Sequence, residues 1–344
     1  MNILRNLSRS EKSLWELLSS SPYPLYSITR AISNLYRNNS IKVEGNLIRL
    51  TDKGKEIARK AGNHYMVGRC NKCEGKGFLP LKDFEELLEE YRKITKGRPE
   101  PKLEFFQGYM RDFDVIMRAA IMDYFEDLRG KEFVLIGDDD LLSLALALTQ
   151  ATKRIVVLDA DERIGDYIKE KVREYGFGLE FIRYNVSNPP PKELVNSFDV
   201  FSSEPLESLS GLHAFLVRGV GFLRKNGVGY FGLTTLEASR RKWFNVEKLL
   251  LRLNCCLTDI IRDFSIYPLH YKTVHYENFV KELPFNVADD NHVNWYRSAL
   301  IRFELVKYAK KHEFSKHINV KTHDRREDIT YPSSIRKAQN EPPR

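Results

Sequence analysis

The stretch FVLIGDDD, residues 133–140, decides how this chain folds. Its apolar residues predict a buried strand over 133–136, and the apolar residues 141–148 predict a helix after the turn. A strand that ends in glycine and opens a helix begins the nucleotide pocket of Rossmann-like sheets. That turn is ordinarily glycine-rich, so that an anion can approach a helix N-terminus. Helix capping explains one acid here but not three, so the turn predicts a positively charged ligand.

Strands and helices alternate along the chain beyond this turn. The sequence predicts further strands over 155–159, 179–184, 198–201 and 227–233, with a helix over 164–175. This succession is typical of a parallel sheet with helices on both faces. The fold class we predict is α/β, with a Rossmann-like, doubly wound sheet of the methyltransferase-like kind.

The N-terminal residues predict a small winged-helix domain in front of the sheet. Ser8 and Glu11 have the spacing of a capping box before an amphipathic helix, and a second helix is predicted over 28–38. Two short apolar runs flank Gly45 like a hairpin, and another helix opens at 51–56. Winged helices contact proteins as well as DNA, so the fold leaves DNA open as an alternative partner.

The charge follows a division of the chain into four parts. Residues 1–62, the winged-helix-like domain, hold 11 Lys/Arg against 5 Asp/Glu, and residues 310–344, a basic and partly flexible tail, hold 9 against 5. A Cys-containing connector and linker over 63–100 and the Rossmann-like catalytic domain over 101–309 lie between them. The net charge of +8 therefore resides at the two ends, while the middle is mildly acidic.

Four cysteines in 344 residues are too few for a disulfide scaffold, which favours a cytoplasmic protein. No apolar stretch approaches a membrane-spanning length, and the first residues lack a signal-peptide core. Cys70 and Cys73 have the spacing of half a zinc knuckle, but the pair Cys255 and Cys256 is adjacent and would point to opposite faces of a strand. We therefore expect a tight turn with two thiols at 70–73, and no metal site.

Polar residues follow several predicted strands, and parallel strands bring such residues to one edge of the sheet. Asp159 lies about 20 residues beyond the first turn, where an acid commonly binds ribose hydroxyls. Asp161 follows it, either as a ligand or as a helix cap. Asn185 comes after the third strand, where a side chain can meet an adenine edge. The run 202–205 follows the fourth strand and would face the reacting group.

The acids at the first turn discriminate between two nucleoside ligands. The methionine carboxylate of S-adenosylmethionine would meet them at a cost of several kcal/mol in a poorly solvated pocket. Decarboxylated S-adenosylmethionine lacks that group and ends in an ammonium, and a polyamine acceptor is also cationic. An acid can further accept the proton of the attacking amine, since only the neutral nitrogen is nucleophilic. This chemistry requires no metal and no bound cofactor.

The chain resembles the branched-chain polyamine synthases, which are N(4)-bis(aminopropyl)spermidine synthases of thermophilic microbes. The resemblance spans most of residues 65–270 and is carried by these motifs: CNKCEGKGF at 70–78, GDDDLLSLALAL at 137–148, VVLDADERI at 156–164, GYFGLTTLEAS at 229–239 with Trp243, and IIRDF at 260–264. It implies aminopropyl transfer from decarboxylated S-adenosylmethionine to the secondary amine of spermidine, methylthioadenosine as by-product, and a homodimer.

The resemblance also implies roles for individual residues. Asp139, the central acid, would orient and deprotonate the amine. The polyamine would be bound by Asp138, Asp140, Glu204, Glu207 and Gln107. The nucleoside would be bound by Gly137, Asp159, Asp161 and Asn185.

The chain departs from the family pattern at three positions. Phe106 and Asn185 stand where the family favours acids, and Glu204 lies where the family has an Asp-Pro-Pro-Glu run. A different amine acceptor or a loss of activity therefore stays open. Two other functions stay open as well: an S-adenosylmethionine-dependent nucleic-acid methyltransferase, and a polyamine-sensing winged-helix regulator without activity.

Overall fold

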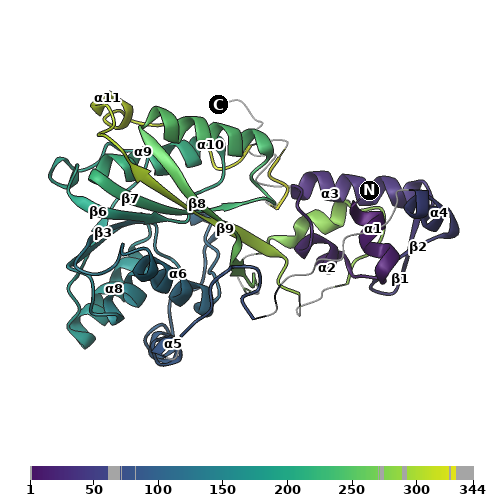
Figure 1. Cartoon of the computed structure of the whole chain (residues 1–344), viewed down its shortest axis with the longest axis horizontal. Coiled ribbons are helices and arrows are strands. Elements are labelled where there is room, and N and C mark those ends of the chain that lie inside the picture. The colour runs from purple at the N-terminus through teal and green to yellow at the C-terminus, as the bar shows by residue number, and fades with distance from the viewer. Residues whose placement is uncertain are drawn as a thin grey trace.

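The structure, a computed structural model, describes residues 2–60, 70, 72–81, 83–269, 271, 275–288, 293–324 and 327–330. A helical N-terminal part lies beside a larger body built on a seven-stranded sheet (Figure 1). No helix among these residues is both long enough and apolar enough to cross a membrane. Residues 61–69, which span the end of the predicted winged-helix-like domain and the start of the connector, and residues 331–344 of the predicted tail lie outside the described residues.

The N-terminal part has the three helices and the hairpin that the sequence predicts, and one further helix, α1, that it did not predict. Its elements are α1 (Asn2–Arg9), α2 (Leu14–Ser19), α3 (Leu25–Arg37), β1 (Ile41–Glu44), β2 (Leu47–Leu50) and α4 (Asp52–Lys60). β1 and β2 pair antiparallel around Gly45, whose φ of +60° lies in the left-handed region that glycine tolerates best.

The capping box of α2 is formed by a different pair from the one we expected. The Ser13 hydroxyl accepts the Glu16 N–H, and the Glu16 carboxylate accepts the Ser13 N–H at 2.7 Å. Ser8 instead donates its hydroxyl to the Arg5 carbonyl. The prediction for Ser8 and Glu11 was therefore wrong. Both pairs have the same spacing, but the apolar run of the helix begins directly after Ser13.

The central sheet has the strand order β5-β4-β3-β6-β7-β9-β8. Its strands are β3 (Glu132–Ile136), β4 (Arg154–Asp159), β5 (Leu179–Arg183), β6 (Phe198–Ser203), β7 (Leu223–Thr234), β8 (Cys255–Tyr267) and β9 (Tyr296–Leu305). The five predicted strands, β3 to β7, are parallel. The sheet is mixed rather than wholly parallel, because β9 pairs antiparallel with both β7 and β8.

Helices cover both faces of this sheet. The helices of the body are α5 (Asp83–Ile94), α6 (Asp112–Tyr124), α7 (Leu142–Leu148), α8 (Glu162–Tyr175), α9 (Leu209–Phe222), α10 (Arg240–Arg252) and α11 (Lys311–Phe314), with short 3-10 turns η1 (Leu103–Phe105), η2 (Lys192–Leu194) and η3 (Glu277–Glu282). Figure 1 shows α6 and α8 on one side of the sheet and α9 and α10 on the other.

The strand β3 explains why both faces are covered. Phe133 and Leu135 belong to one buried cluster with residues of α6, α7 and α8. Val134 and Ile136 belong to another, with residues of α9 and α10. Successive side chains of a strand point to opposite faces, so an unbroken apolar strand requires a core on each side.

The N-terminal part packs against the body next to the loop that follows β7. The Trp15 ring lies 5.7 Å from Trp295 and 6.2 Å from Phe279, measured between ring centroids. The Leu25 N–H, at the start of α3, donates to the Leu236 carbonyl at 2.8 Å. This packing places α2 and α3 behind one wall of the cavity described below.

Candidate active site

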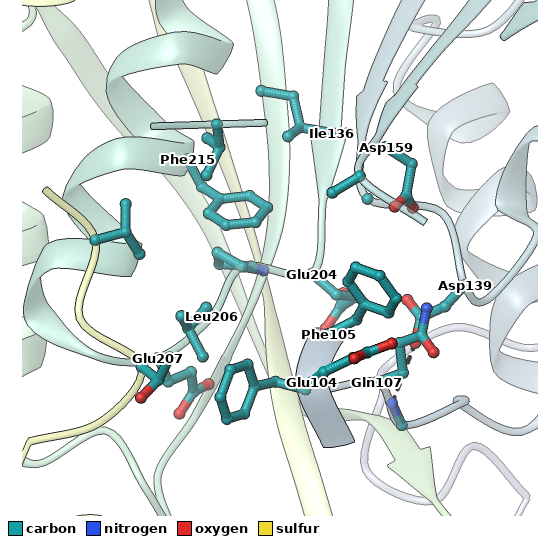
Figure 2. A pocket seen from close by; sticks show the side chains of 18 of the residues that line it. Glu104, Phe105, Gln107, Ile136, Asp139, Asp159, Glu204, Leu206, Glu207 and Phe215 are labelled. Carbon is teal, nitrogen blue, oxygen red and sulfur yellow. Dashed lines mark hydrogen bonds between the residues drawn. The ribbon is translucent and has the colours of Figure 1, made fainter. Parts of the chain in front are cut away.

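A cavity of about 410 Å³ opens at the carboxyl ends of the parallel strands. Figure 2 shows Asp139 and Glu207 on opposite sides of Glu204 in this cavity. Its wall carries the following six acids: Glu104, Asp139, Asp159, Glu204, Glu207 and Glu237. No Lys, Arg or His stands among the described residues of that wall. Such a cavity attracts cations.

The turn after β3 divides its three acids between the cavity and the protein interior. Gly137 has a φ of +75° and Leu141 has a φ of +55°, so left-handed residues flank the acids on both sides. Asp139 lines the cavity. Asp138 and Asp140 lie behind the turn, where they line a small void of about 10 Å³.

Asp139 is a partly buried acid held by one backbone contact. Its Oδ2 accepts the Gly108 N–H at 3.1 Å. Burial raises the pKa of Asp139 well above its usual range, and the charges of Asp140 and Asp159 raise it further. In the ligand-free protein these surroundings therefore disfavour the charged form of Asp139. A bound cation would lower its pKa and favour the carboxylate.

Asp138 and Asp140 hold the turn in place. Asp138 Oδ1 accepts the Ser143 N–H at 3.2 Å, and Asp140 Oδ1 accepts the Met110 N–H at 2.5 Å. Burial raises the pKa of Asp138 well above its usual range. Burial, together with the charge of Glu204, raises the pKa of Asp140 to about 7.

Asp159 faces the cavity and also organises the turn. Its Oδ2 accepts the Asp138 N–H at 2.9 Å and its Oδ1 accepts the Asp161 N–H at 2.8 Å. Asp161 lies outside the cavity wall and is 1% exposed. It caps α8 through the Arg163 N–H and also pairs with the Arg163 side chain at 2.6 Å. Of the two roles open to Asp161, the geometry shows the helix cap.

Gln107 and Asn185 both line the cavity, but their amide groups are already engaged. Gln107 Nε2 donates to Asp161 Oδ2 at 2.9 Å, and its Oε1 accepts the Lys102 N–H at 2.9 Å. Asn185 Oδ1 accepts the Ser187 N–H at 2.9 Å. The Asn185 Nδ2 protons are the part of these two side chains best suited to a ligand.

A positively charged side chain, that of Arg118, lies beside Glu204. The Arg118 guanidinium and the Tyr267 hydroxyl both donate to its carboxylate. Arg118 comes from α6 and is 1% exposed. A Cβ at Gly232 would lie 1.9 Å from Glu204 Oε2, so the glycine leaves room for this carboxylate. The Glu204 charge is therefore balanced within the protein.

Glu207 lies across the cavity and binds the end of β7. Its two oxygens accept the Thr234 N–H and the Thr234 hydroxyl, each at 2.5 Å. Burial raises the pKa of Glu207 to about 7.

The sequence arguments missed three residues of the site: Arg118, Glu237 and Tyr296. Arg118 lies on a helix upstream of the first predicted strand, where no motif marks it. Glu237 carries a signal that we passed over, since it follows the predicted strand 227–233 as other site residues follow theirs.

The described residues contain no group of three or more His, Cys, Asp or Glu side chains arranged to hold a metal ion. Cys70 and Cys73 are both free thiols, and a turn spans residues 72–75. Backbone N–H groups of Gly77 and Gly75 lower the pKa of the Cys73 thiol. Cys255 is buried and Cys256 is exposed, as expected for neighbours in a strand.

Comparisons with known proteins agree with this geometry. Residues 86–329 match the family model of the branched-chain polyamine synthase A C-terminal domain. The chain is 33% identical to the N(4)-bis(aminopropyl)spermidine synthase of Thermococcus kodakarensis over 333 residues, which cover 96% of this chain and 93% of that protein. It is also 33% identical over 302 residues to the enzyme of that name from Thermus thermophilus, covering 88% and 85% of the two chains.

A solved structure matches along nearly the whole chain. It is the branched-chain polyamine synthase of Thermus thermophilus in complex with N4-aminopropylspermidine and 5'-methylthioadenosine. The match has a TM-score of 0.81 at 30% identity and covers 96% of this chain and 93% of that one. From the family model, the relatives and this structural match, we conclude that the chain belongs to the branched-chain polyamine synthase family.

Proposed function

We propose that the protein is an aminopropyltransferase that moves the aminopropyl group of decarboxylated S-adenosylmethionine onto the secondary amine of a polyamine such as spermidine. The observation that carries this proposal is the cavity of six acids whose described wall holds no basic residue. Both reactants are cations, and the methionine carboxylate of S-adenosylmethionine would be repelled there. The names of the relatives and the ligands of the solved relative support the same reaction.

The proposed step is a displacement at carbon. The lone pair of the amine nitrogen attacks the methylene carbon bound to the sulfonium, and a C–N bond forms while the C–S bond breaks. The bonding electrons go to sulfur, which leaves as the neutral thioether of methylthioadenosine. Before the attack, Asp139 acts as general base and accepts a proton from the protonated secondary amine, which frees this lone pair; the tertiary nitrogen of the product keeps the proton that it then carries. Alignment of nitrogen, carbon and sulfur in the cavity supplies much of the remaining rate enhancement.

The nucleoside end of the cavity is assigned to the strand ends β3, β4 and β5. Asp159 would accept hydrogen bonds from ribose hydroxyls, and the Asn185 amide would donate to the adenine edge. Gly137 leaves the backbone of the turn open to the ligand. Asp138 and Asp140 then act by holding the Asp139 backbone in place.

Product analysis tests this function directly. The protein is incubated with decarboxylated S-adenosylmethionine and spermidine, and the products are separated by mass spectrometry. We expect spermidine to gain aminopropyl units at its internal nitrogen, with an equal amount of methylthioadenosine. S-adenosylmethionine should bind far more weakly than its decarboxylated form. Equal affinity for the two nucleosides, or methyl transfer to RNA or DNA, would overturn the assignment.

Three further assignments extend beyond the reaction. We assign residues 1–62 to a winged-helix-like domain, supported by the order of helices and hairpin there. The other boundaries, 63–100, 101–309 and 310–344, are proposed with it. A homodimer follows from family likeness, and light scattering of the purified protein tests it. The cytoplasmic location stays a prediction from the cysteine content.

A further inference from the structure

We propose that Glu237 binds a terminal ammonium group of the acceptor polyamine, at the end of the cavity opposite Asp139. This inference rests on the proposed function and names a residue that determines which amine is accepted. Glu237 follows β7 in the loop before α10, and it is 7% exposed although it lines the cavity.

Glu237 differs from the other cavity acids in what its carboxylate contacts. Glu204 pairs with Arg118, and Glu104 pairs with Lys102 at 3.3 Å. Each has a basic partner within the protein.

Asp159 uses its oxygens on two backbone N–H groups, and Glu207 uses both oxygens on Thr234. Within the described part of the chain, the Glu237 carboxylate accepts only from hydroxyl groups, those of Tyr296 at 2.7 Å and of Thr330. Hydroxyl donors orient a carboxylate but bring no positive charge.

Lys242, whose charge acts on Glu237, is committed to other carboxylates. Lys242 Nζ lies 2.5 Å from Asp328 and 3.4 Å from Asp324, and it donates to the Glu237 backbone carbonyl rather than to the carboxylate. Burial, with the charges of Asp328 and Glu207, raises the pKa of Glu237 to about 8. A buried acid of this kind is either neutral or paired with an incoming cation.

The position suits the far end of an extended amine. Thr234, the last residue of β7, contacts both acids: its Oγ1 accepts the Glu237 N–H at 2.9 Å and donates to the Glu207 carboxylate. Glu237 and Glu207 are therefore both held at the end of β7. Figure 2 shows Glu207 on the opposite side of Glu204 from Asp139. Apolar and aromatic residues of the same wall, Leu206 and Tyr267 among them, suit the methylene chain between two ammonium groups.

Substrate analogues separate this role from a general loss of activity. Wild type and E237Q are compared on spermidine and on two analogues, each with one terminal ammonium replaced by a methyl group. We expect E237Q to raise KM for spermidine roughly 10- to 100-fold, as for loss of a charged hydrogen bond, with kcat and the KM of the nucleoside changed less than about twofold. For the analogue that lacks the ammonium bound by Glu237, the two proteins should have the same KM.

A matched control and a second variant complete the test. E90Q removes the same charge from the exposed face of α5, where Glu90 pairs with Lys93, and should leave every KM unchanged. Y296F keeps the Glu237 charge but removes the hydroxyl that orients it, so KM for spermidine should rise a few-fold. An unchanged KM for spermidine in E237Q, or an equal rise on spermidine and both analogues, would overturn the inference.

The proposed function can fail separately. If the wild-type protein transfers an aminopropyl group to no amine, the proposed function is wrong. Calorimetric titration of spermidine into wild type and E237Q then still decides the role of Glu237. Weaker binding to E237Q alone supports it, and equal binding to both proteins contradicts it.

Discussion

At the scale of single residues, the turn after β3 gives three identical side chains two different environments. Asp139 faces the cavity, whereas Asp138 and Asp140 accept backbone N–H groups behind it. The left-handed φ angles of Gly137 and Leu141 shape this turn. A conservative change at Asp139 should therefore affect a different property of the protein from a change at Asp138 or Asp140.

Asp139→Asn should lower kcat by roughly 10²- to 10⁴-fold, the range for loss of a general base. The amide keeps the shape of the side chain and its contact with the Gly108 N–H, so methylthioadenosine should bind unchanged. Initial rates and calorimetry measure the two effects. The partly buried Asp123, which pairs with Arg129, provides the control variant Asp123→Asn. A D139N protein with wild-type kcat would remove Asp139 from the mechanism.

Arg118→Met should destabilise the protein, by at most about 3–5 kcal/mol, because it leaves the half-buried Glu204 carboxylate at the cavity wall without a positive partner. The double variant Arg118→Met with Glu204→Gln should recover part of that loss, since neither charge then remains. Urea unfolding followed by circular dichroism gives the free energies. Equal losses for the single and double variants would show that the Arg118–Glu204 pair is not the source of the effect.

The sequence predicted those residues that follow parallel strands, since their place at the sheet edge depends on local pattern alone. Asp139, Asp159 and Asn185 all line the cavity for this reason. Arg118 could not be found in this way, because α6 meets Glu204 only through the tertiary fold. Whether a strand-end acid faces the ligand or caps a helix, as Asp161 does, also depends on contacts far along the chain.

At the scale of elements, α9 packs on β6 through a glycine. A Cβ at Gly219 would lie 2.4 Å from the ring of Phe201, so the helix and the strand meet at that point without room for a methyl group. Close approach of this kind fixes the distance between α9 and the sheet.

Gly219→Ala should lower the free energy of unfolding by about 1–3 kcal/mol through overpacking, even though alanine favours a helix. Gly178→Ala is the matched control, because no atom lies within 4 Å of its Cβ position. Urea unfolding of both variants gives the comparison. Equal stability of G219A and G178A would mean that α9 shifts freely on the sheet.

Elements with a strong local pattern were predicted well, and elements that depend on pairing were not. The strands β3 to β7 are apolar and separated by helical stretches, which makes them visible in the sequence. β8 carries charged residues such as Asp259 and Arg262 and is exposed at alternate positions. Its place at the edge of the sheet, paired only with β9, carries no signature in the local sequence.

At the scale of the whole molecule, buried acids make stability depend on pH. Burial raises the pKa of Asp140 and of Glu207 to about 7 and that of Glu237 to about 8. The unfolded chain releases these protons near pH 4 to 4.5, while the folded protein retains them. Between those limits the folded state holds more protons, so the free energy of unfolding falls as pH rises.

The free energy of unfolding of the ligand-free protein, measured in urea, should therefore fall as pH rises from about 5 to about 8. Glu237→Gln should flatten the fall by as much as about 1.4 kcal/mol per pH unit, the value for one titrating group. Bound polyamine should stabilise the protein more at the upper end of this range, where the acids give up their protons. Identical slopes for wild type and E237Q would refute the link to this residue.

In acidic solution, below the usual glutamate pKa, the free energy of unfolding changes in the opposite direction and rises as pH rises. The Arg111 guanidinium holds the pKa of Glu74 at about 2, below its usual value. Stability from that pair is present above the usual glutamate pKa and is lost as pH falls toward 2. The ligand-free protein should therefore be most stable in mildly acidic solution.

Because β9 lies between β7 and β8, the sheet can be completed only after β9 has been synthesised. During translation β8 leaves the ribosome before β9, and its hydrogen-bonding partner in the sheet arrives only with residues Tyr296–Leu305. Until then the nascent chain presents unpaired edges on both β7 and β8, which are ready templates for aggregation. A message truncated ahead of β9 should therefore yield inclusion bodies, although all the parallel strands β3 to β7 are present.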